Sequence, residues 1–151
     1  MKQKTTVLLV EDNKTDLFLT RTAFERAEFK NPLQEVRNGE EAIAYLKGQG
    51  PYWDRGRFPM PAVMLLDLKM PMKDGFEVLK WVAAQTGLKR ISIIVLSGST
   101  RAEDVEQAFA LGAKSFLLKP SSIEELTTMM RCLRDWIEYN HFPAPLATLS
   151  G

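Results

Sequence analysis

The chain has 151 residues, which suits one domain and is too short for two domains of ordinary size. Hydrophobic residues make up 45% of the sequence and charged residues 26%, so a core can form without disulfides, and the single cysteine, Cys132, excludes an internal one. A net charge of +1 argues against nucleic acid or a membrane surface as a partner, and no apolar run approaches the roughly 20 residues of a membrane helix, so we expect a cytoplasmic protein.

Short aliphatic runs alternate with amphipathic stretches five times along the chain. We predict a buried strand at each run: Val7–Val10, Leu33–Val36, Ala62–Leu66, Ile91–Leu96 and Ser115–Leu118. Apolar residues recur at helical intervals in the stretches between and after them, which predicts helices that contain Leu17–Ala27, Ala42–Leu46, Phe76–Val82, Val105–Leu111 and Ile123–Ile137. This alternation indicates an α/β fold with a parallel sheet covered by helices on both faces.

Four of the expected helix starts carry a capping pattern, in which a Ser, Thr, Asn or Asp precedes a glutamate by three residues. The pairs are Asn38 with Glu41, Asp74 with Glu77, Thr100 with Glu103, and Ser121 with Glu124. Because all four stand at strand-to-helix junctions, they support a (βα)5 order. Right-handed crossovers then leave few topologies for the sheet.

Two segments lie outside the alternation. Gly48–Pro61 is a long loop between a helix and the next strand, so we expect it at the edge of the sheet opposite the carboxyl ends of the strands. Its aromatic residues either pack on the underside of the domain, which we expect, or bind a partner; they are Tyr52, Trp53 and Phe58. We assign residues 1–141 to one domain and residues 142–151, where prolines stop the last helix, to a tail without a domain of its own.

The last predicted helix has two apolar stripes. The first stripe is made of Ile123, Leu126, Met130, Leu133 and Ile137, and it is wide enough to pack on the sheet. The second stripe lies beside the first and is made of Met129, Cys132 and Trp136. The combined apolar arc has two explanations, a deeply embedded helix or a surface for a partner or a second copy of the chain.

Ligands of an open parallel α/β sheet bind beyond the carboxyl ends of its strands. Three acids, one hydroxyl and one lysine follow the predicted strands there: Glu11 and Asp12, Asp67, Ser97, and Lys119. Two carboxylates about 4 Å apart repel by roughly 4 kcal/mol at an effective dielectric of 20, so the acids need a proton, a lysine or a metal beside them. Such oxygen ligands suit Mg²⁺, and a cation, a lysine and a hydroxyl together are suited to hold a phosphoryl group.

The segments around these residues carry a family resemblance. They are Glu11-Asp12 after Val-Leu-Leu-Val, Asp67 in Leu-Leu-Asp-Leu-Lys-Met-Pro-Met-Lys-Asp-Gly, Ser97-Gly98, and Phe116-Leu-Leu-Lys119-Pro120. Together they resemble the receiver domain of two-component response regulators, and the resemblance extends from about Thr5 to Asn140. It implies a flavodoxin-like, doubly wound (βα)5 fold with a five-stranded parallel sheet in the order 2-1-3-4-5.

The resemblance also implies the chemistry of the site. Asp67 would be the phosphoacceptor and would form an aspartyl phosphate. The implied Mg²⁺ ligands are Asp12, Asp67 and the backbone carbonyl of Lys69, with Glu11 acting largely through metal-bound water. Catalysis would consist of positioning and charge neutralisation, as in other phosphoryl transfers.

Three further residues have implied roles in the reaction and in the switch. Lys119 and Ser97 would contact the phosphoryl oxygens. Movement of Ser97 toward the phosphoryl group, together with inward rotation of Phe116, would carry the signal. We expect the peptide bond between Lys119 and Pro120 to be cis, because this would aim the lysine into the site.

The sequence therefore predicts a single-domain response regulator that signals by phosphorylation-dependent change of shape and by protein contact. Its implied partners are a sensor histidine kinase or a histidine phosphotransfer protein and an unknown output protein. The phosphoryl donor must be a separate molecule, because the sole histidine of the chain, His141, lies at the end of the last helix. It would not be an enzyme, although it would catalyse its own phosphorylation and slow dephosphorylation. The alternative is a phosphorylation-independent interaction module with the same fold.

Two details of the sequence bear on partners. In the resembling family, the face formed by the fourth helix, fifth strand and fifth helix often binds partners, so Met129, Cys132 and Trp136 are candidates for a partner or homodimer surface. Insertions like Gly48–Pro61 are similar to those in stand-alone receivers paired with phytochrome-like kinases, and the role of this loop stays open.

Overall fold

One parallel sheet of five strands organises the computed structural model, which describes residues 5–70 and 72–144. The strands are β1 (Val7–Val10), β2 (Leu33–Val36), β3 (Val63–Leu66), β4 (Ser92–Ser97) and β5 (Ser115–Leu118). They lie in the order β2-β1-β3-β4-β5, which confirms the prediction. The helices are α1 (Lys14–Arg26), α2 (Gly39–Lys47), α3 (Gly75–Ala83), α4 (Ala102–Ala110) and α5 (Ile123–Tyr139).

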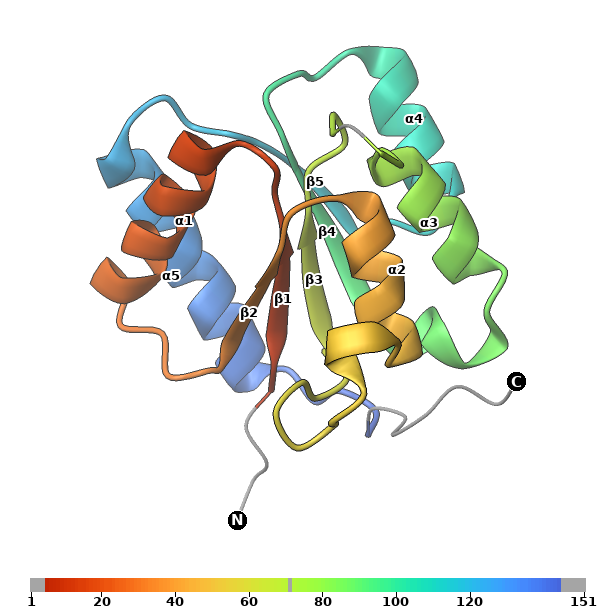
Figure 1. The fold of residues 1–151 in the computed structure, drawn as a ribbon. Coiled ribbons are helices and arrows are strands. Elements are labelled where there is room, and N and C mark those ends of the chain that lie inside the picture. The colour runs from red at the N-terminus through yellow and green to blue at the C-terminus, as the bar shows by residue number, and fades with distance from the viewer. Residues whose placement is uncertain (1–4, 71, 145–151) are drawn as a thin grey trace.

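The helices form one layer on each face of the sheet. Helices α1 and α5 cover one face, and α2, α3 and α4 cover the other (Figure 1). Two short 3-10 turns, Gly50–Tyr52 and Thr86–Arg90, precede β3 and β4. This is the flavodoxin-like, doubly wound arrangement that the sequence predicts. In the described part of the chain, no helix combines the length and the apolar character needed to cross a bilayer.

The core lies on both sides of the sheet. Successive side chains of a strand point to opposite faces, so β1 places Leu8 and Val10 toward α2, α3 and α4, and Val7 and Leu9 toward α1 and α5. All four of these residues are buried, as are the four residues of β3. Burial on both faces explains why these strands are continuous aliphatic runs rather than alternating ones.

The observed helices and strands begin close to their predicted positions. Strands β3 and β4 each begin one residue later than predicted, at Val63 and Ser92. Helices α2 and α3 start at their predicted caps, where the side-chain oxygens of Asn38 and Asp74 accept hydrogen bonds of 2.8 and 3.0 Å from the backbone N–H three residues further on. These caps satisfy backbone donors that have no partner within the helix.

Two predicted caps are wrong. Helix α5 is capped by Ser122, whose hydroxyl accepts from the backbone N–H of Glu125 at 3.1 Å, and not by Ser121. Two overlapping Ser-x-x-Glu patterns occur there, and local sequence does not choose between them. Helix α4 begins after Arg101 without a side-chain cap, so Thr100 has no capping role. Its N-terminal end lies at the surface, where water satisfies the free N–H groups.

The long loop from α2 to β3 folds onto the edge of the sheet where the strands begin, as predicted (Figure 1). Tyr52 and Phe58 pack against Tyr45 of α2, with ring centroids 5.1 and 6.0 Å from that of Tyr45, and the Phe58 ring meets the Tyr45 ring edge-on. Arg55 fixes this arrangement by donating hydrogen bonds of 2.7 and 2.8 Å to two carbonyl oxygens in the last turn of α2. The expected packing of the aromatic residues is wrong for Trp53, which follows the 3-10 turn and is 74% exposed.

The segment after α5 contacts the rest of the domain at two points. The ring of Phe142 meets Trp136 edge-on, with centroids 5.4 Å apart, and Arg90 donates a hydrogen bond of 3.0 Å to the carbonyl of Ala144. Residues 145–151 of the predicted tail lie outside the described residues. The division of the chain at residue 141 stays a prediction.

Candidate functional site

A cavity of about 380 Å³ opens where β1, β3, β4 and β5 end, at the rim predicted for the site. It is lined by Asp12, Asn13, Asp16, Asp67, Lys69, Ser97, Gly98, Ser99 and Lys119. Glu11 lies behind this lining, 2% exposed, and contacts Lys119. The structure thus brings together all the residues for which the sequence predicts phosphoryl or metal contacts.

Backbone hydrogen bonds hold these side chains at the rim. The sheet ladder continues one residue beyond each strand, so that Asp67 donates to β1, Glu11 to β2 and Lys119 to β4, at N–O distances of 3.1, 3.1 and 2.7 Å. A side chain on the first residue after a strand is therefore fixed by the sheet rather than by a loop. This arrangement preorganises the site before any ligand arrives.

Glu11, Asp12 and Asp67 form a compact group of carboxylates, with one oxygen from each lying within 4.8 Å of the others. Burial raises the pKa of Glu11 to about 7; the hydrogen bond from Lys119 opposes this rise, and the charge of Asp67 adds to it. The group is therefore short of positive charge. Because it consists of hard oxygen donors and opens to a cavity, it fits a divalent cation.

Lys119 is the positive charge nearest to these carboxylates. Its ammonium donates hydrogen bonds to Glu11 Oε1 at 2.5 Å and to Asp16 Oδ2 at 3.0 Å, and lies 3.7 Å from Asp67 Oδ2. Burial alone would lower the pKa of Lys119, but the hydrogen bond to Glu11 and the charge of Asp67 outweigh it and raise the pKa. The peptide bond to Pro120 is trans, so the predicted cis bond is wrong; the hydrogen bonds of the ammonium suffice to aim the side chain.

Asp16 is the site residue that the sequence reasoning missed. It is the third residue of α1, where Asn13 Oδ1 accepts a hydrogen bond of 2.9 Å from its backbone N–H. The signal for it was available in the capping spacing Asn13-x-x-Asp16, which places a carboxylate in the first helical turn beside the rim.

The loop from β3 to α3 carries the backbone carbonyl of Lys69. It leaves β3 in a tight turn, in which the N–H of Lys69 donates to Asp67 Oδ1 at 3.4 Å, and continues through left-handed φ angles of 51° at Met72 and 73° at Lys73. Gly75 then approaches β3 so closely that a Cβ atom would clash with the carbonyl of Asp67. A glycine is therefore needed to bring the start of α3 against the site.

The two predicted switch residues lie on neighbouring strands. Ser97 ends β4 and is 2% exposed, and its hydroxyl oxygen accepts a hydrogen bond of 3.2 Å from the N–H of Ser99. Phe116 of β5 is half-buried and packs against the core beneath α2, α3 and α4. Their roles in a switch stay predictions.

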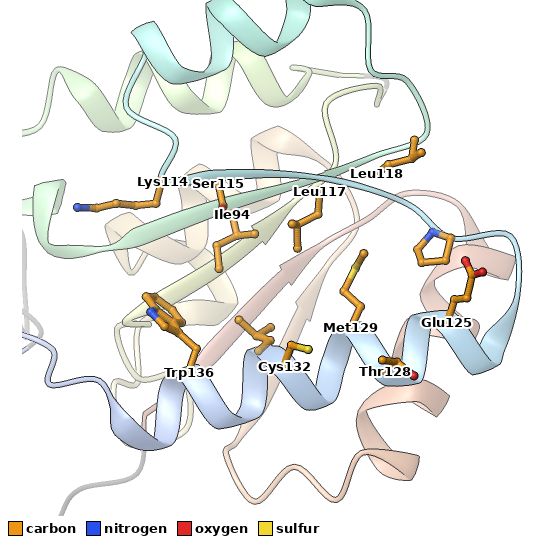
Figure 2. Close-up of a pocket in the computed structure, with 12 residues that line it drawn as sticks. Ile94, Lys114, Ser115, Leu117, Leu118, Glu125, Thr128, Met129, Cys132 and Trp136 are labelled. Atoms are coloured by element: carbon orange, nitrogen blue, oxygen red, sulfur yellow. The ribbon is translucent and has the colours of Figure 1, made fainter.

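A second and mostly apolar cavity of about 770 Å³ lies between β5 and α5 (Figure 2). Met129, Cys132 and Trp136, which the sequence marks as a candidate partner surface, project from α5 into this groove, and Leu117 faces them from β5. Leu118 at the end of β5 is 51% exposed. The first apolar stripe of α5 packs on the core, and in the second stripe Cys132 and Trp136 are exposed while Met129 is half-buried against that core.

Comparison with known proteins establishes the class of this protein. Residues 7–131 match the family model of the response regulator receiver domain, and the chain therefore belongs to that family of two-component signalling proteins. Probable methanogenesis regulatory protein FilR2 of Methanothrix harundinacea (strain 6Ac) is 34% identical over 92% of this chain and 88% of its own length. Response regulator Rcp1 of Synechocystis sp. (strain ATCC 27184 / PCC 6803 / Kazusa) is 34% identical over 91% of this chain and 92% of its own length.

Solved structures agree with this assignment. The phosphorylated cyanobacterial phytochrome response regulator RcpA superimposes with a TM-score of 0.85 and 31% identity, covering 94% of this chain and 100% of RcpA. The Mn²⁺-bound form of Rcp1 gives a TM-score of 0.81 and 34% identity, covering 93% of this chain and 99% of Rcp1. The predicted fold and family are confirmed.

Proposed function

We propose that this protein is a single-domain response regulator that takes a phosphoryl group from a phosphohistidine onto Asp67. The convergence of three carboxylates and Lys119 on one open cavity carries this proposal. Asp67 is nearly buried, yet it lines that cavity, so a donor can reach it from one side only. The donor is a sensor histidine kinase or a histidine phosphotransfer protein, and the similarity to RcpA favours a kinase of the phytochrome type. We expect the reaction in the cytoplasm.

Mg²⁺ is the cation we propose for the carboxylate group. When bound, it neutralises charge on the carboxylates and on the phosphoryl oxygens. Asp12 and Asp67 would hold it through their carboxylates and Lys69 through its backbone carbonyl, with Glu11 completing the group from the buried side. The separation of the carboxylate oxygens supports this assignment, as does the similarity to a protein solved in a Mn²⁺-bound form.

The side chains of the cavity suit each part of the transfer. A carboxylate oxygen of Asp67 forms a bond to phosphorus, while the bond from phosphorus to the donor's imidazole nitrogen breaks and leaves its electron pair on nitrogen. Lys119 pairs with the phosphoryl oxygens, and the hydroxyl of Ser97 donates to one of them. In slow dephosphorylation, an oxygen of water forms a bond to phosphorus, the bond from phosphorus to the Asp67 oxygen breaks, and inorganic phosphate leaves with the Asp67 carboxylate regenerated.

The signal follows from the new charge. A phosphoryl group adds about −1.5 to −2 charges and strong acceptor oxygens. The Ser97 hydroxyl, whose oxygen accepts from the N–H of Ser99, donates its O–H to the phosphoryl group, and its movement toward that group moves the loop before α4. Phe116, which is half-buried against the core, then turns inward and becomes more buried.

Output is by protein contact. The groove lined by Met129, Cys132 and Trp136 runs beside β5, the strand that directly precedes Lys119. We propose it as the surface that an output protein recognises. Homodimerisation through the same surface is the competing use, and sedimentation velocity on the phosphorylated protein distinguishes the two.

Incubation with Mg²⁺ and acetyl phosphate, followed by intact-mass measurement, tests the proposed function. We expect the wild type to gain one phosphoryl group, Asp67→Asn to gain none, and chelation of Mg²⁺ to abolish the gain. Asp54→Asn is the matched control, because Asp54 lies in the loop at the opposite edge of the sheet and should leave labelling intact. Equal labelling of Asp67→Asn would contradict the assignment, and an unlabelled wild type would favour the phosphorylation-independent interaction module.

A further inference from the structure

The ammonium of Lys119 has one N–H bond left after its hydrogen bonds to two carboxylates. An ammonium group has three N–H bonds, and two of them are used in hydrogen bonds to Glu11 and Asp16. Asp67 lies at 3.7 Å, which is an ion-pair distance but too long for a hydrogen bond. A phosphoryl group on Asp67 can accept from the third N–H bond, and the ammonium can move further toward it only by lengthening its hydrogen bond to Glu11 or to Asp16.

The carboxylate of Asp16 does not close a capping box at the start of α1. An acid at the third position of a helix commonly closes a capping box by accepting from the N–H of the cap residue. Here that N–H, on Asn13, donates to Glu11 Oε2 at 3.3 Å. The Asp16 carboxylate points instead to Lys119, so its position serves the site and not only the start of α1.

Burial indicates which of the two acids, Glu11 or Asp16, loses its hydrogen bond to Lys119. The Glu11 side chain is 2% exposed, so water cannot replace the hydrogen bond from Lys119 if that bond is lost. The Asp16 side chain is 38% exposed and returns to water when released. The bond to Asp16 is thus the one that breaks when a phosphoryl group arrives.

We propose that Asp16 is a positioning residue that holds Lys119 back from the phosphoryl group and thereby slows phosphorylation of Asp67. This inference rests on the proposed function. Asp16 does not touch the reacting atoms; it acts through the ammonium of Lys119. It also adds a negative charge to the lining of the cavity through which an anionic phosphodonor enters.

The test compares a graded series of variants at saturating Mg²⁺. Asp16→Ala removes the acceptor, Asp16→Asn keeps a neutral acceptor, and Asp16→Glu restores the charge. Glu124→Gln is the matched control, because it removes one negative charge from the first turn of α5 outside the described lining of the cavity. Two quantities are measured, the affinity for beryllofluoride, which mimics a phosphoryl group on a carboxylate, and the rate of labelling by acetyl phosphate.

We expect Asp16→Ala to bind beryllofluoride roughly threefold more tightly and to be labelled roughly threefold faster than the wild type, since one exposed hydrogen bond no longer competes. Asp16→Asn should lie between the two, and Asp16→Glu and Glu124→Gln should match the wild type. A merely structural role would instead lower both quantities together with the melting temperature. If Asp16→Ala does not fold, the comparison of Asp16→Asn with Asp16→Glu decides.

Two results overturn the inference, and they can be told apart. If the wild type responds to both reagents while the Asp16 variants are unchanged or slower, Asp16 does not restrain Lys119 and the proposed function stands. If the folded wild type responds to neither reagent, the proposed function fails and this inference fails with it.

Discussion

At the scale of single residues, the carboxylates at the rim of the sheet favour cation binding but lower the stability of the fold. Glu11, Asp12 and Asp67 repel one another, and Lys119 supplies one positive charge against three negative ones. Replacing Asp12 by asparagine keeps the shape of the side chain and removes one repelling charge. We expect Asp12→Asn to raise the free energy of unfolding by about 1 kcal/mol in the presence of EDTA.

The same substitution should remove the response to metal. Mg²⁺ stabilises a protein that binds it only in the folded state, so the wild type should melt at a higher temperature as Mg²⁺ is added, and Asp12→Asn should not. Thermal unfolding with EDTA and with Mg²⁺ measures both effects. Asp135→Asn, which changes an exposed acid of α5, is the control and should behave as the wild type does. A variant that is less stable than the wild type in EDTA would show that repulsion does not dominate at Asp12.

At the scale of elements, Arg55 joins the long loop to the end of α2. Its guanidinium donates to the carbonyl oxygens of Tyr45 and Leu46 in the last turn of that helix, and the Tyr45 oxygen also accepts from the N–H of Gly48. We expect Arg55→Met to lower the free energy of unfolding by about 2 kcal/mol, as for loss of hydrogen bonds to a half-buried charged group. Urea unfolding gives this value.

A matched arginine in the same loop serves as the control. Arg57 is exposed, and its guanidinium carbon lies 5.5 Å from the ring centroid of Phe58. Arg57→Met should cost less than about 0.5 kcal/mol. Both variants should keep the wild-type rate of labelling by acetyl phosphate, because the loop lies at the edge of the sheet away from Asp67. A slower rate in Arg55→Met would mean that the loop influences the site.

At the scale of the whole molecule, phosphorylation should change one side of the sheet. With Mg²⁺ and beryllofluoride, we expect slower hydrogen exchange in residues 97–101 and in β5, because Ser97 gains a contact and Phe116 becomes more buried. The loop over residues 48–61 should be unchanged. Hydrogen–deuterium exchange read by mass spectrometry measures this, with Asp67→Asn as the control that shows no change. Changes confined to the loop would refute the proposed switch.

How much could be predicted from the sequence depends on how local each signal is. Aliphatic runs and the acids directly after them belong to short segments, so the strands and the carboxylate group could be predicted. The contact of Asp16 with Lys119 joins residues 103 positions apart and depends on how α1 packs on the sheet beside α5, which no local pattern records. The choice of Ser122 over Ser121 as a cap likewise depends on how the chain leaves β5.

Strand β5 is only four residues long and lies at the edge of the sheet. Lys119 follows it directly, and the apolar groove runs along its side. Phosphorylation of Asp67 beside one end of this strand and binding of a protein along its side are therefore expected to be coupled. A protein that grips the groove more firmly when Asp67 is phosphorylated must, by thermodynamic reciprocity, strengthen the hold on the phosphoryl group by the same factor. An output protein bound in the groove would then shift the equilibrium toward phosphorylated Asp67.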